Sequence, residues 1–174
     1  MKKLDTTWSP EQIVEEGTYL RSMKTGIWIE FYANGNLRSK MEYKNNRPNG
    51  ACTLYYENGH IRECGNWIGT RWTGDYRVYY PNDSLRFLFH YNQLGQRDGI
   101  QFYYYPTGKL WFSSNLKANK EDGWTREYDE TGKVLTERYY SIYPDSCKFI
   151  DHRNPDRLNC PADQPEGILM DHRS

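Results

Sequence analysis

The feature that most constrains this sequence is a pattern that returns about every 24 residues. Glycines at positions 26, 50, 74, 99 and 123 open successive copies, which start 24, 24, 25 and 24 residues apart. A fixed period in this range indicates a repeat architecture, in which each copy forms one unit of supersecondary structure. The region 26–140 is therefore expected to fold as five equivalent units.

Each copy carries ring-bearing and aliphatic residues at fixed distances from its opening glycine, which is counted as position 0. Position 5 is always aromatic, position 6 is Tyr in four copies, and position 11 is always aliphatic. Such regularity predicts that equivalent residues of all copies line up in the structure. Position 5 holds Phe31, Tyr55, Tyr79, Tyr104 and Tyr128, and position 12 holds Arg38, Arg62, Arg86, Trp111 and Leu135.

The corner of each copy predicts a β-hairpin. Asn-Gly between aromatic and β-branched residues is a strong hairpin signal, because both residues of a two-residue turn need positive φ. The corners are Asn34-Gly35, Asn58-Gly59, Asn82-Asp83, Thr107-Gly108 and Thr131-Gly132, of which the first two match this signal fully. Short links such as 44–49 keep neighbouring hairpins adjacent. The prediction is all-β: a single-layer antiparallel meander of about twelve strands, which should curl because it is long.

A two-residue turn at Asn34-Gly35 places Tyr32 opposite Leu37 and Phe31 opposite Arg38. Alternation along the strands then separates two faces. One face, expected to be the core, carries Trp28, Tyr32, Leu37, Met41 and Tyr43 in the first copy. In the third copy it carries Tyr76, Val78, Tyr80, Leu85, Phe87, Phe89 and Tyr91. The other face should pair each position-5 ring with position 12, which gives a ladder of aromatic–Arg pairs.

The ends of the chain depart from the repeat. Residues 1–25 are expected to form an N-terminal cap, with a short helix near 10–16 that begins at Ser9-Pro10 and ends at Gly17. A strand from Thr18 to about Met23 should follow, and a degenerate repeat is a competing interpretation of the same segment. Residues 141–174 contain four prolines and are expected to be an irregular C-terminal cap or tail.

Bulk composition excludes several classes of function. Twenty-three basic and 23 acidic residues give a formal net charge of zero, so no excess charge steers the chain toward nucleic acid or an anionic membrane. No apolar run approaches the roughly 20 residues of a membrane-spanning helix. The N-terminus lacks the apolar core of a secretory signal, which predicts a cytoplasmic protein with reduced cysteines.

The pattern Gly-x-x-x-x-aromatic-Tyr-x-Asn-Gly-x-Leu, with an aromatic residue at position 17, resembles the MORN-variant repeat. This is the repeat of bacterial proteins often labelled the YwqK family of toxin–antitoxin antitoxins, and the resemblance covers about 26–140. It implies a twisted β-meander used as a binding scaffold, with no catalytic residues. Glu57 and Ala33 stand where the standard MORN repeat would have a Gly, so the variant is the better match.

These observations predict a non-enzymatic protein-binding module, most concretely an immunity or antitoxin protein that blocks a cognate toxin. Aromatic and Arg side chains are common interface hot spots. The alternatives are a structural or assembly component of a larger complex or virus particle, and an adaptor for anionic lipid. Open sheet edges would also allow an edge-to-edge homodimer. The partner-binding candidates are Tyr55, Arg62, Tyr79, Arg86, Tyr104 and Trp111.

The sequence predicts no catalytic, metal or cofactor site. No nucleophile triad, phosphate loop or paired-carboxylate motif stands out. Cys147 and Cys160 lie near His152 but lack the close Cys pairs that structural zinc prefers, and a disulfide between the two stays open. Cys52 and Cys64 should not bond to each other, because the expected register points their thiols to opposite faces.

Overall fold

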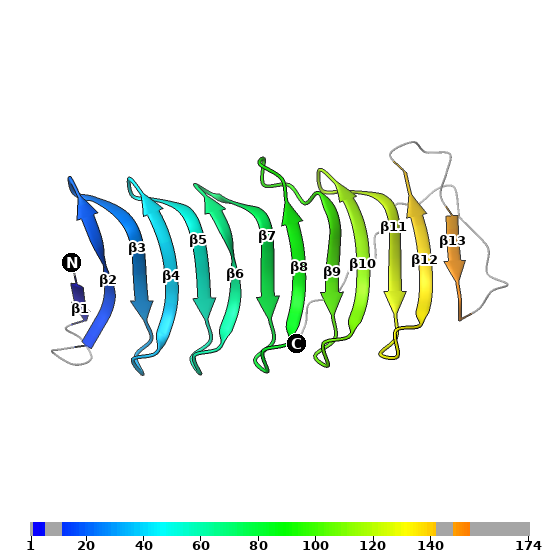
Figure 1. Ribbon diagram of the computed structural model, residues 1–174, viewed down its shortest axis with the longest axis horizontal. Coiled ribbons are helices and arrows are strands. Elements are labelled where there is room, and N and C mark those ends of the chain that lie inside the picture. Colours follow the sequence, from blue (N-terminus) through cyan, green and yellow to red (C-terminus); the bar gives the residue numbers. More distant parts are fainter. Residues whose placement is uncertain (1, 6–11, 142–147, 154–174) are drawn as a thin grey trace.

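The structure is a computed structural model that describes residues 2–5, 12–141 and 148–153. These residues form one sheet of 13 strands, in which each strand pairs with its neighbours in chain order (Figure 1). All pairs are antiparallel. The strands are β1 (Lys2–Asp5), β2 (Gln12–Leu20), β3 (Met23–Phe31), β4 (Leu37–Lys44), β5 (Arg47–Tyr55), β6 (Ile61–Ile68), β7 (Arg71–Tyr79), β8 (Leu85–Tyr91), β9 (Gly99–Tyr104), β10 (Leu110–Lys117), β11 (Lys120–Tyr128), β12 (Val134–Tyr140) and β13 (Lys148–Asp151).

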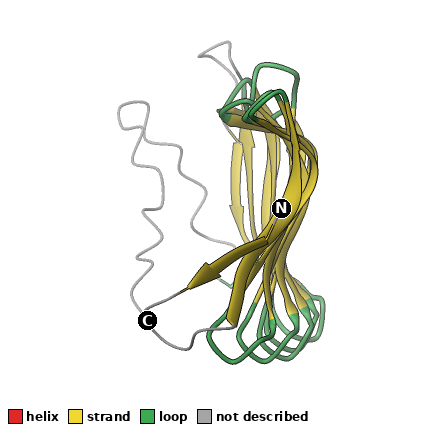
Figure 2. Cartoon of the chain, turned by 90° about the vertical axis from the view of Figure 1, so that its left-hand side faces the viewer, coloured by secondary structure: helices red, strands yellow, loops and turns green. Residues whose placement is uncertain are grey.

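The sheet is a single curved layer. Figure 2 views it along its length and shows the strands superimposed as one arc. Among the described residues there is no helix and no second layer of strands. The predicted all-β antiparallel meander is therefore confirmed.

The hairpin corners are three-residue loops, so the predicted two-residue turns are wrong. In the first copy the Tyr32 N–H donates to the Asn36 carbonyl at 2.8 Å, and the Gly35 N–H donates to the Tyr32 carbonyl at 2.9 Å. Only Gly35 in this loop has positive φ, at 84°. This geometry is a type I turn followed by a bulge with a left-handed residue. The same pair of bonds recurs at the other four corners.

The longer loop shifts the pairing by one residue. Phe31 pairs with Leu37, and the next pair is Glu30 with Ser39, which leaves Arg38 in a β-bulge. The expected pairing of position 5 with position 12 does not occur, because position 12 is the bulged residue in every copy. The observed pairs of positions 5 and 11 are Phe31–Leu37, Tyr55–Ile61, Tyr79–Leu85, Tyr104–Leu110 and Tyr128–Val134.

Two-residue turns lie instead at the opposite end of the hairpins. Asn45 and Asn46, and likewise Ala118 and Asn119, both have positive φ between paired strand ends. The opening glycines lie nearby, where the register shifts and the strands bend. Gly50 is the most extreme of them, with φ of 128° in β5.

Tyrosines at position 6 connect consecutive hairpins. The phenolic hydroxyl of each tyrosine donates to the backbone carbonyl of the position-5 residue in the next copy. The next hairpin therefore has to lie in register for the bond to form, so this ladder fixes the spacing of the repeats. The bonds are Tyr32 to Tyr55 (2.7 Å), Tyr56 to Tyr79 (2.8 Å), Tyr80 to Tyr104 (3.0 Å) and Tyr105 to Tyr128 (2.9 Å).

The N-terminal helix expected near 10–16 is not confirmed. Residues 12–16 belong to β2, where Glu15 pairs with Glu30 of β3, while residues 10 and 11 lie outside the described part. Gly17 does not end a helix. A Cβ at this position would overlap the indole of Trp28, so the lack of a side chain at Gly17 leaves room for the Trp28 ring. In the C-terminal region expected to be irregular, β13 pairs with β12.

The two faces of the sheet differ in burial. We call them the Trp28 face and the Tyr79 face. The buried apolar side chains Trp28, Cys52 and Phe89 all lie on the first, which was expected to form the core. Leu37 and Leu85 were assigned to this face but lie on the other, because each pairs with a position-5 ring. Few side chains are fully buried in the described part, as expected of a single layer.

Candidate binding surfaces

A chain of aromatic rings runs across the middle of the Trp28 face. Trp67 contacts Trp72 edge-on at 4.5 Å between ring centroids, and Trp72 lies 4.4 Å from Tyr76. The contacts continue through Phe89 and Tyr103 as far as β10. Burial, together with the hydrogen bond from the Tyr76 hydroxyl to Glu63, raises the pKa of Tyr76, so the phenol stays protonated and donates to the carboxylate. These rings form a continuous series of contacts from β6 to β10.

A hollow of about 200 Å³ lies on the same face at the N-terminal copies. Its floor includes Trp28, and the Lys24 ammonium lies 4.1 Å from the centroid of that ring. Lys24 also pairs with Glu15; burial opposes its charge, but the bond to this carboxylate raises the pKa of Lys24. The hollow is lined by Glu15, Lys24, Trp28, Glu30, Tyr32, Arg38, Ser39, Met41, Tyr43, Leu54 and Arg62.

Three bulge arginines, Arg38, Arg62 and Arg86, form a row on the Trp28 face. Arg38 and Arg62 line the hollow, and Arg62 donates to Glu63 at 3.1 Å. The guanidinium carbon of Arg86 lies 4.8 Å from the Phe87 ring centroid and 5.5 Å from that of Tyr80. We call this set the arginine row. In the fourth copy Trp111 takes the same place, in ring contact with Tyr103 and Tyr105.

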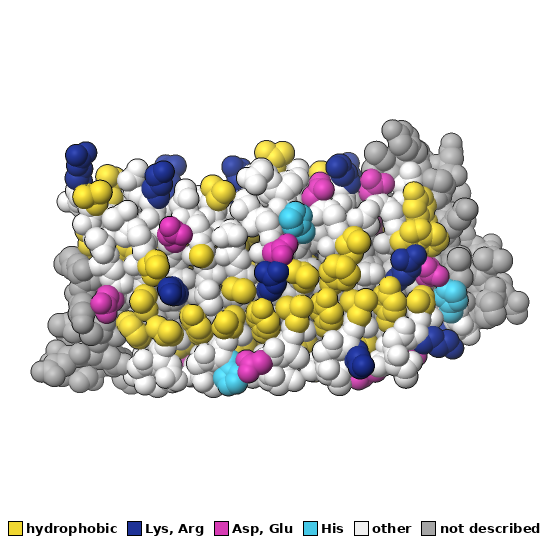
Figure 3. All heavy atoms as spheres, in the orientation of Figure 1, with side chains coloured by type: hydrophobic (Ala, Val, Ile, Leu, Met, Phe, Trp, Pro, Cys, Tyr) yellow, Lys and Arg dark blue, Asp and Glu magenta, His cyan; other side chains and the backbone are white. Residues whose placement is uncertain are grey.

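The Tyr79 face carries a continuous apolar band, built from positions 5 and 11 of all five copies. Figure 3 shows this face, with hydrophobic side chains in a band that crosses the strands. The side chains of the band are half-buried, and Ile61 is exposed. We call this surface the tyrosine band: Phe31, Leu37, Tyr55, Ile61, Tyr79, Leu85, Tyr104, Leu110, Tyr128 and Val134.

The six candidate residues therefore divide between two surfaces. Tyr55, Tyr79 and Tyr104 lie in the tyrosine band. Arg62, Arg86 and Trp111 lie on the other face, so the predicted aromatic–Arg ladder is not formed. The one-residue shift at the corner loop is the cause, because it moves position 12 from opposite the ring into a bulge.

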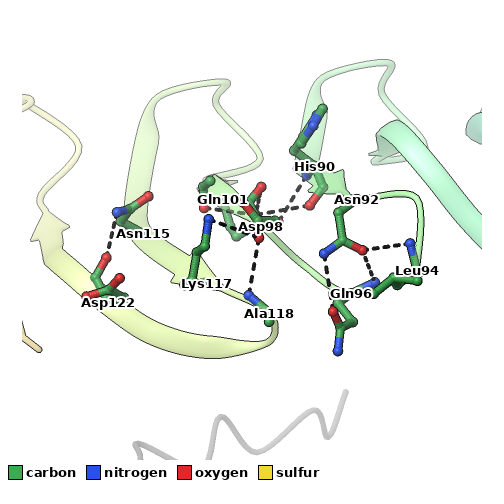
Figure 4. Close-up of polar contacts among 11 residues, drawn as sticks. His90, Asn92, Leu94, Gln96, Asp98, Gln101, Asn115, Lys117, Ala118 and Asp122 are labelled. Carbon is green, nitrogen blue, oxygen red and sulfur yellow. Dashed lines mark hydrogen bonds and ion pairs between the residues drawn. The ribbon is translucent and has the colours of Figure 1, made fainter. Parts of the chain in front are cut away.

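Sequence reasoning missed a gap in the sheet between β8 and β9. Only two residue pairs, Phe87–Tyr103 and Leu88–Phe102, join these strands directly. Beside them the fully buried Gln101 side chain replaces the missing ladder: its Oε1 accepts from the His90 N–H at 3.1 Å, and its Nε2 donates to the His90 carbonyl at 3.3 Å (Figure 4). The step of 25 residues between the third and fourth copies is the sequence signal of this irregularity.

The expectations for metal ligands and cysteines can be compared with the described residues. They contain no group of three His, Cys, Asp or Glu side chains placed to hold a metal ion. Cys52 opposes Gly65 and Cys64 opposes Thr53, which confirms the expected separation, and both thiols are free. Cys147 and Cys160 lie outside the described residues. No helix in the described part is long and apolar enough to span a membrane.

Comparison with known proteins places the repeats in a family. The family described as MORN repeat variant matches residues 24–45, 48–68, 72–93 and 97–118, which together make up half of the chain. The fifth copy lies outside these matches. No curated protein matches the chain significantly.

Several solved structures are similar over part of their length. A point mutant of S. aureus TarM in complex with fondaparinux, alpha-GlcNAc-glycerol and UDP is 15% identical, with 63% of this chain and 19% of that chain covered and a TM-score of 0.25. A second TarM structure is 16% identical, with 64% and 19% covered and a TM-score of 0.25. Accessory secretory protein 1, 2 and 3 of Streptococcus pneumoniae is 8% identical, with 86% and 23% covered and a TM-score of 0.25. This chain spans about a fifth of the length of these structures.

Proposed function

The chain belongs to the MORN repeat variant family, and from this premise we propose that it is a non-enzymatic module that binds a protein partner. The tyrosine band carries the proposal. It presents a ring and an aliphatic side chain from each of five hairpins, and no described residue covers it. Large contiguous apolar surfaces of this kind mark interaction sites, and Tyr is enriched at interface hot spots.

The specific role that we propose is that of a cytoplasmic immunity or antitoxin protein, which occludes a cognate toxin in the manner implied by the resemblance to the YwqK family. A broad, repetitive surface suits this role, because an inhibitor needs to cover a site rather than transform a substrate. The same proposal includes the absence of a catalytic centre in this chain.

The test is co-expression with the product of the neighbouring reading frame. We expect that product to slow growth when expressed alone, this chain to restore growth, and the two proteins to elute as one complex from gel filtration. The double variant Tyr55→Ser/Tyr79→Ser should lose both rescue and complex. Ile27→Ser is the matched control, since Ile27 is 52% exposed on the same face but outside the band.

Two results would contradict the proposal. One is full rescue by the double variant with an unchanged elution profile. The other is a wild-type chain that elutes only with large particles or co-sediments with anionic vesicles, which would favour an assembly component or a lipid adaptor. Circular dichroism of each variant, compared with wild type, separates loss of binding from loss of folding.

A further inference from the structure

The arginine row has a spacing that the sheet itself sets. Arg38, Arg62 and Arg86 occupy the same bulge position in consecutive hairpins, so each lies two strands from the next. Strands in a sheet are about 4.8 Å apart, and the row therefore repeats every ~9.6 Å. Because the tyrosine ladder holds each hairpin against the next, this spacing is regular.

The charges of the row are only partly neutralised by the protein. Arg38 is exposed and has no ion pair among the described residues. Arg62 pairs with Glu63 but keeps 43% of its side chain exposed. Arg86 stacks against Phe87 and Tyr80, which orients its guanidinium without removing its charge. The row is thus a line of three cations, of which Arg86 lies against aromatic rings, while Arg38 and Arg62 line the hollow that also contains carboxylates.

A linear ligand for this row needs a negative group about every 9.6 Å on one side. A polyproline II helix has three residues per turn and rises about 3.1 Å per residue, so every third side chain lies on the same side at ~9.3 Å. In a β-strand the side chains on one face are ~6.6 Å apart. In an α-helix the side chains on one face repeat after seven residues, at ~10.5 Å. This repeat differs more from the ~9.6 Å spacing of the arginines than the polyproline II repeat does. The polyproline II repeat fits best.

The surroundings of the row favour the same ligand. Grooves that recognise polyproline II segments are lined by aromatic side chains. Here Tyr80 and Phe87 lie next to Arg86, and Trp111 continues the row in the fourth copy. Carboxylates are the natural partners of guanidinium groups, which hold them with paired hydrogen bonds.

We propose that the arginine row binds an extended polyproline II segment of a protein partner that carries an acidic side chain at every third residue. The residue that reaches Trp111 in this register is apolar. This site lies on the face opposite the tyrosine band and goes beyond the function proposed above, since it can be occupied whether or not a toxin binds the band.

The experiment uses a fluorescent peptide of three Glu-Pro-Pro triplets and one Leu-Pro-Pro triplet at the end, called the Glu-Pro-Pro peptide, with binding followed by fluorescence anisotropy. A peptide of the same composition with its three glutamates adjacent, a Lys-Pro-Pro peptide and a single-stranded oligonucleotide serve as comparisons. We expect the Glu-Pro-Pro peptide to bind at least about tenfold more tightly than any of these, and added salt to weaken it.

Variants locate the site. Arg62→Gln/Arg86→Gln should weaken the Glu-Pro-Pro peptide about tenfold, as expected for two partly exposed charge pairs. Arg77→Gln, which removes an exposed arginine from the Tyr79 face, should leave binding unchanged, and so should Tyr55→Ser/Tyr79→Ser. Undetectable binding of the Glu-Pro-Pro peptide, equal binding of the adjacent-glutamate peptide or oligonucleotide, or equal loss with Arg77→Gln overturns the proposal.

Discussion

The phenolic hydroxyl of Tyr56 donates a hydrogen bond to the backbone carbonyl oxygen of Tyr79, 2.8 Å away, and so joins two consecutive hairpins near their loops. Tyr55, the preceding residue, points to the opposite face and lies in the tyrosine band. Two adjacent tyrosines therefore have different tasks: one fixes the spacing of the repeats, and the other presents a ring to solvent.

Replacing Tyr56 by Phe should destabilise the protein by about 0.5–1.5 kcal/mol, the usual net contribution of a hydrogen bond, because the Tyr79 carbonyl loses its side-chain donor. Tyr55→Phe is the matched control and should change the free energy of unfolding by less. Urea denaturation of both variants measures the difference. Equal effects of the two substitutions would show that the ladder does not contribute to stability.

Replacing Gln101 by Leu should cost about 1–3 kcal/mol, because the His90 N–H and carbonyl lose the buried Gln101 amide that pairs with them, while a side chain of similar size still fills the space. The effect should be local as well as global. Hydrogen exchange of the amides in β8 and β9 should accelerate more than that of β4 and β5. A uniform acceleration along the sheet would argue against a specific role for Gln101 at this junction.

The opening glycines should differ in their tolerance of alanine. Gly26 has φ of 67°, near the left-handed helical region, and open space around its Cα, so Gly26→Ala should cost about 1–2 kcal/mol. Gly50 has φ of 128°, which side chains rarely adopt, and a Cβ there would also displace the Glu42 carboxylate. Gly50→Ala should therefore cost more, about 2–3 kcal/mol. Thermal and urea unfolding rank the two variants, and the reverse order would contradict the backbone argument.

Glu137 should contribute to the loss of stability in acid. A hydrogen bond from Arg126, and a smaller effect of one from His152, hold the pKa of Glu137 below its ordinary value of 4.5. A carboxylate with a lowered pKa stabilises the fold above its ordinary pKa, and this contribution disappears as the pH falls through the folded value.

The difference in unfolding free energy between wild type and Glu137→Gln should accordingly be largest near neutral pH and shrink below about pH 4.5. Glu57→Gln, at an exposed hairpin loop, is the control for the substitution itself. A Glu137→Gln difference that is constant between pH 7 and pH 3 would show that these hydrogen bonds do not favour the ionised form.

The architecture could be predicted from the sequence because its period is explicit. Five glycines and the rings that follow them define strands of known length, and polar corners separate those strands. The Trp28 face was identified as the core by simple alternation. The β2 strand was missed in part because Ser9-Pro10 resembles a helix start, while the requirement for Gly17 beside Trp28 is a tertiary contact that only the fold reveals.

The sequence itself contained evidence against two-residue turns at the corner loops. A two-residue turn needs positive φ at both residues, and β-branched Thr107 and Thr131 tolerate it poorly. A three-residue loop needs positive φ only at the glycine, so Thr-Gly and Asn-Gly fit it equally well. One residue of register decided the faces of Arg62, Arg86 and Trp111, and with them the shape of both candidate surfaces.

The last hairpin has Asp129 where the four earlier copies have the ladder tyrosine. Its carboxylate turns back on its own loop and accepts from the backbone N–H groups of Thr131 and Lys133 at 2.8 and 3.0 Å. In each earlier copy the residue at this position bonds to the hairpin that follows, whereas the hydrogen bonds of the Asp129 carboxylate in the described part stay within its own loop. The tyrosine hydrogen bonds between consecutive hairpins therefore all run in one direction along the chain, and the series ends at Asp129. Lengthening it by a further 24-residue copy after this hairpin would require restoring tyrosine at 129, whereas a copy inserted between the first and second hairpins would find its connection already in place.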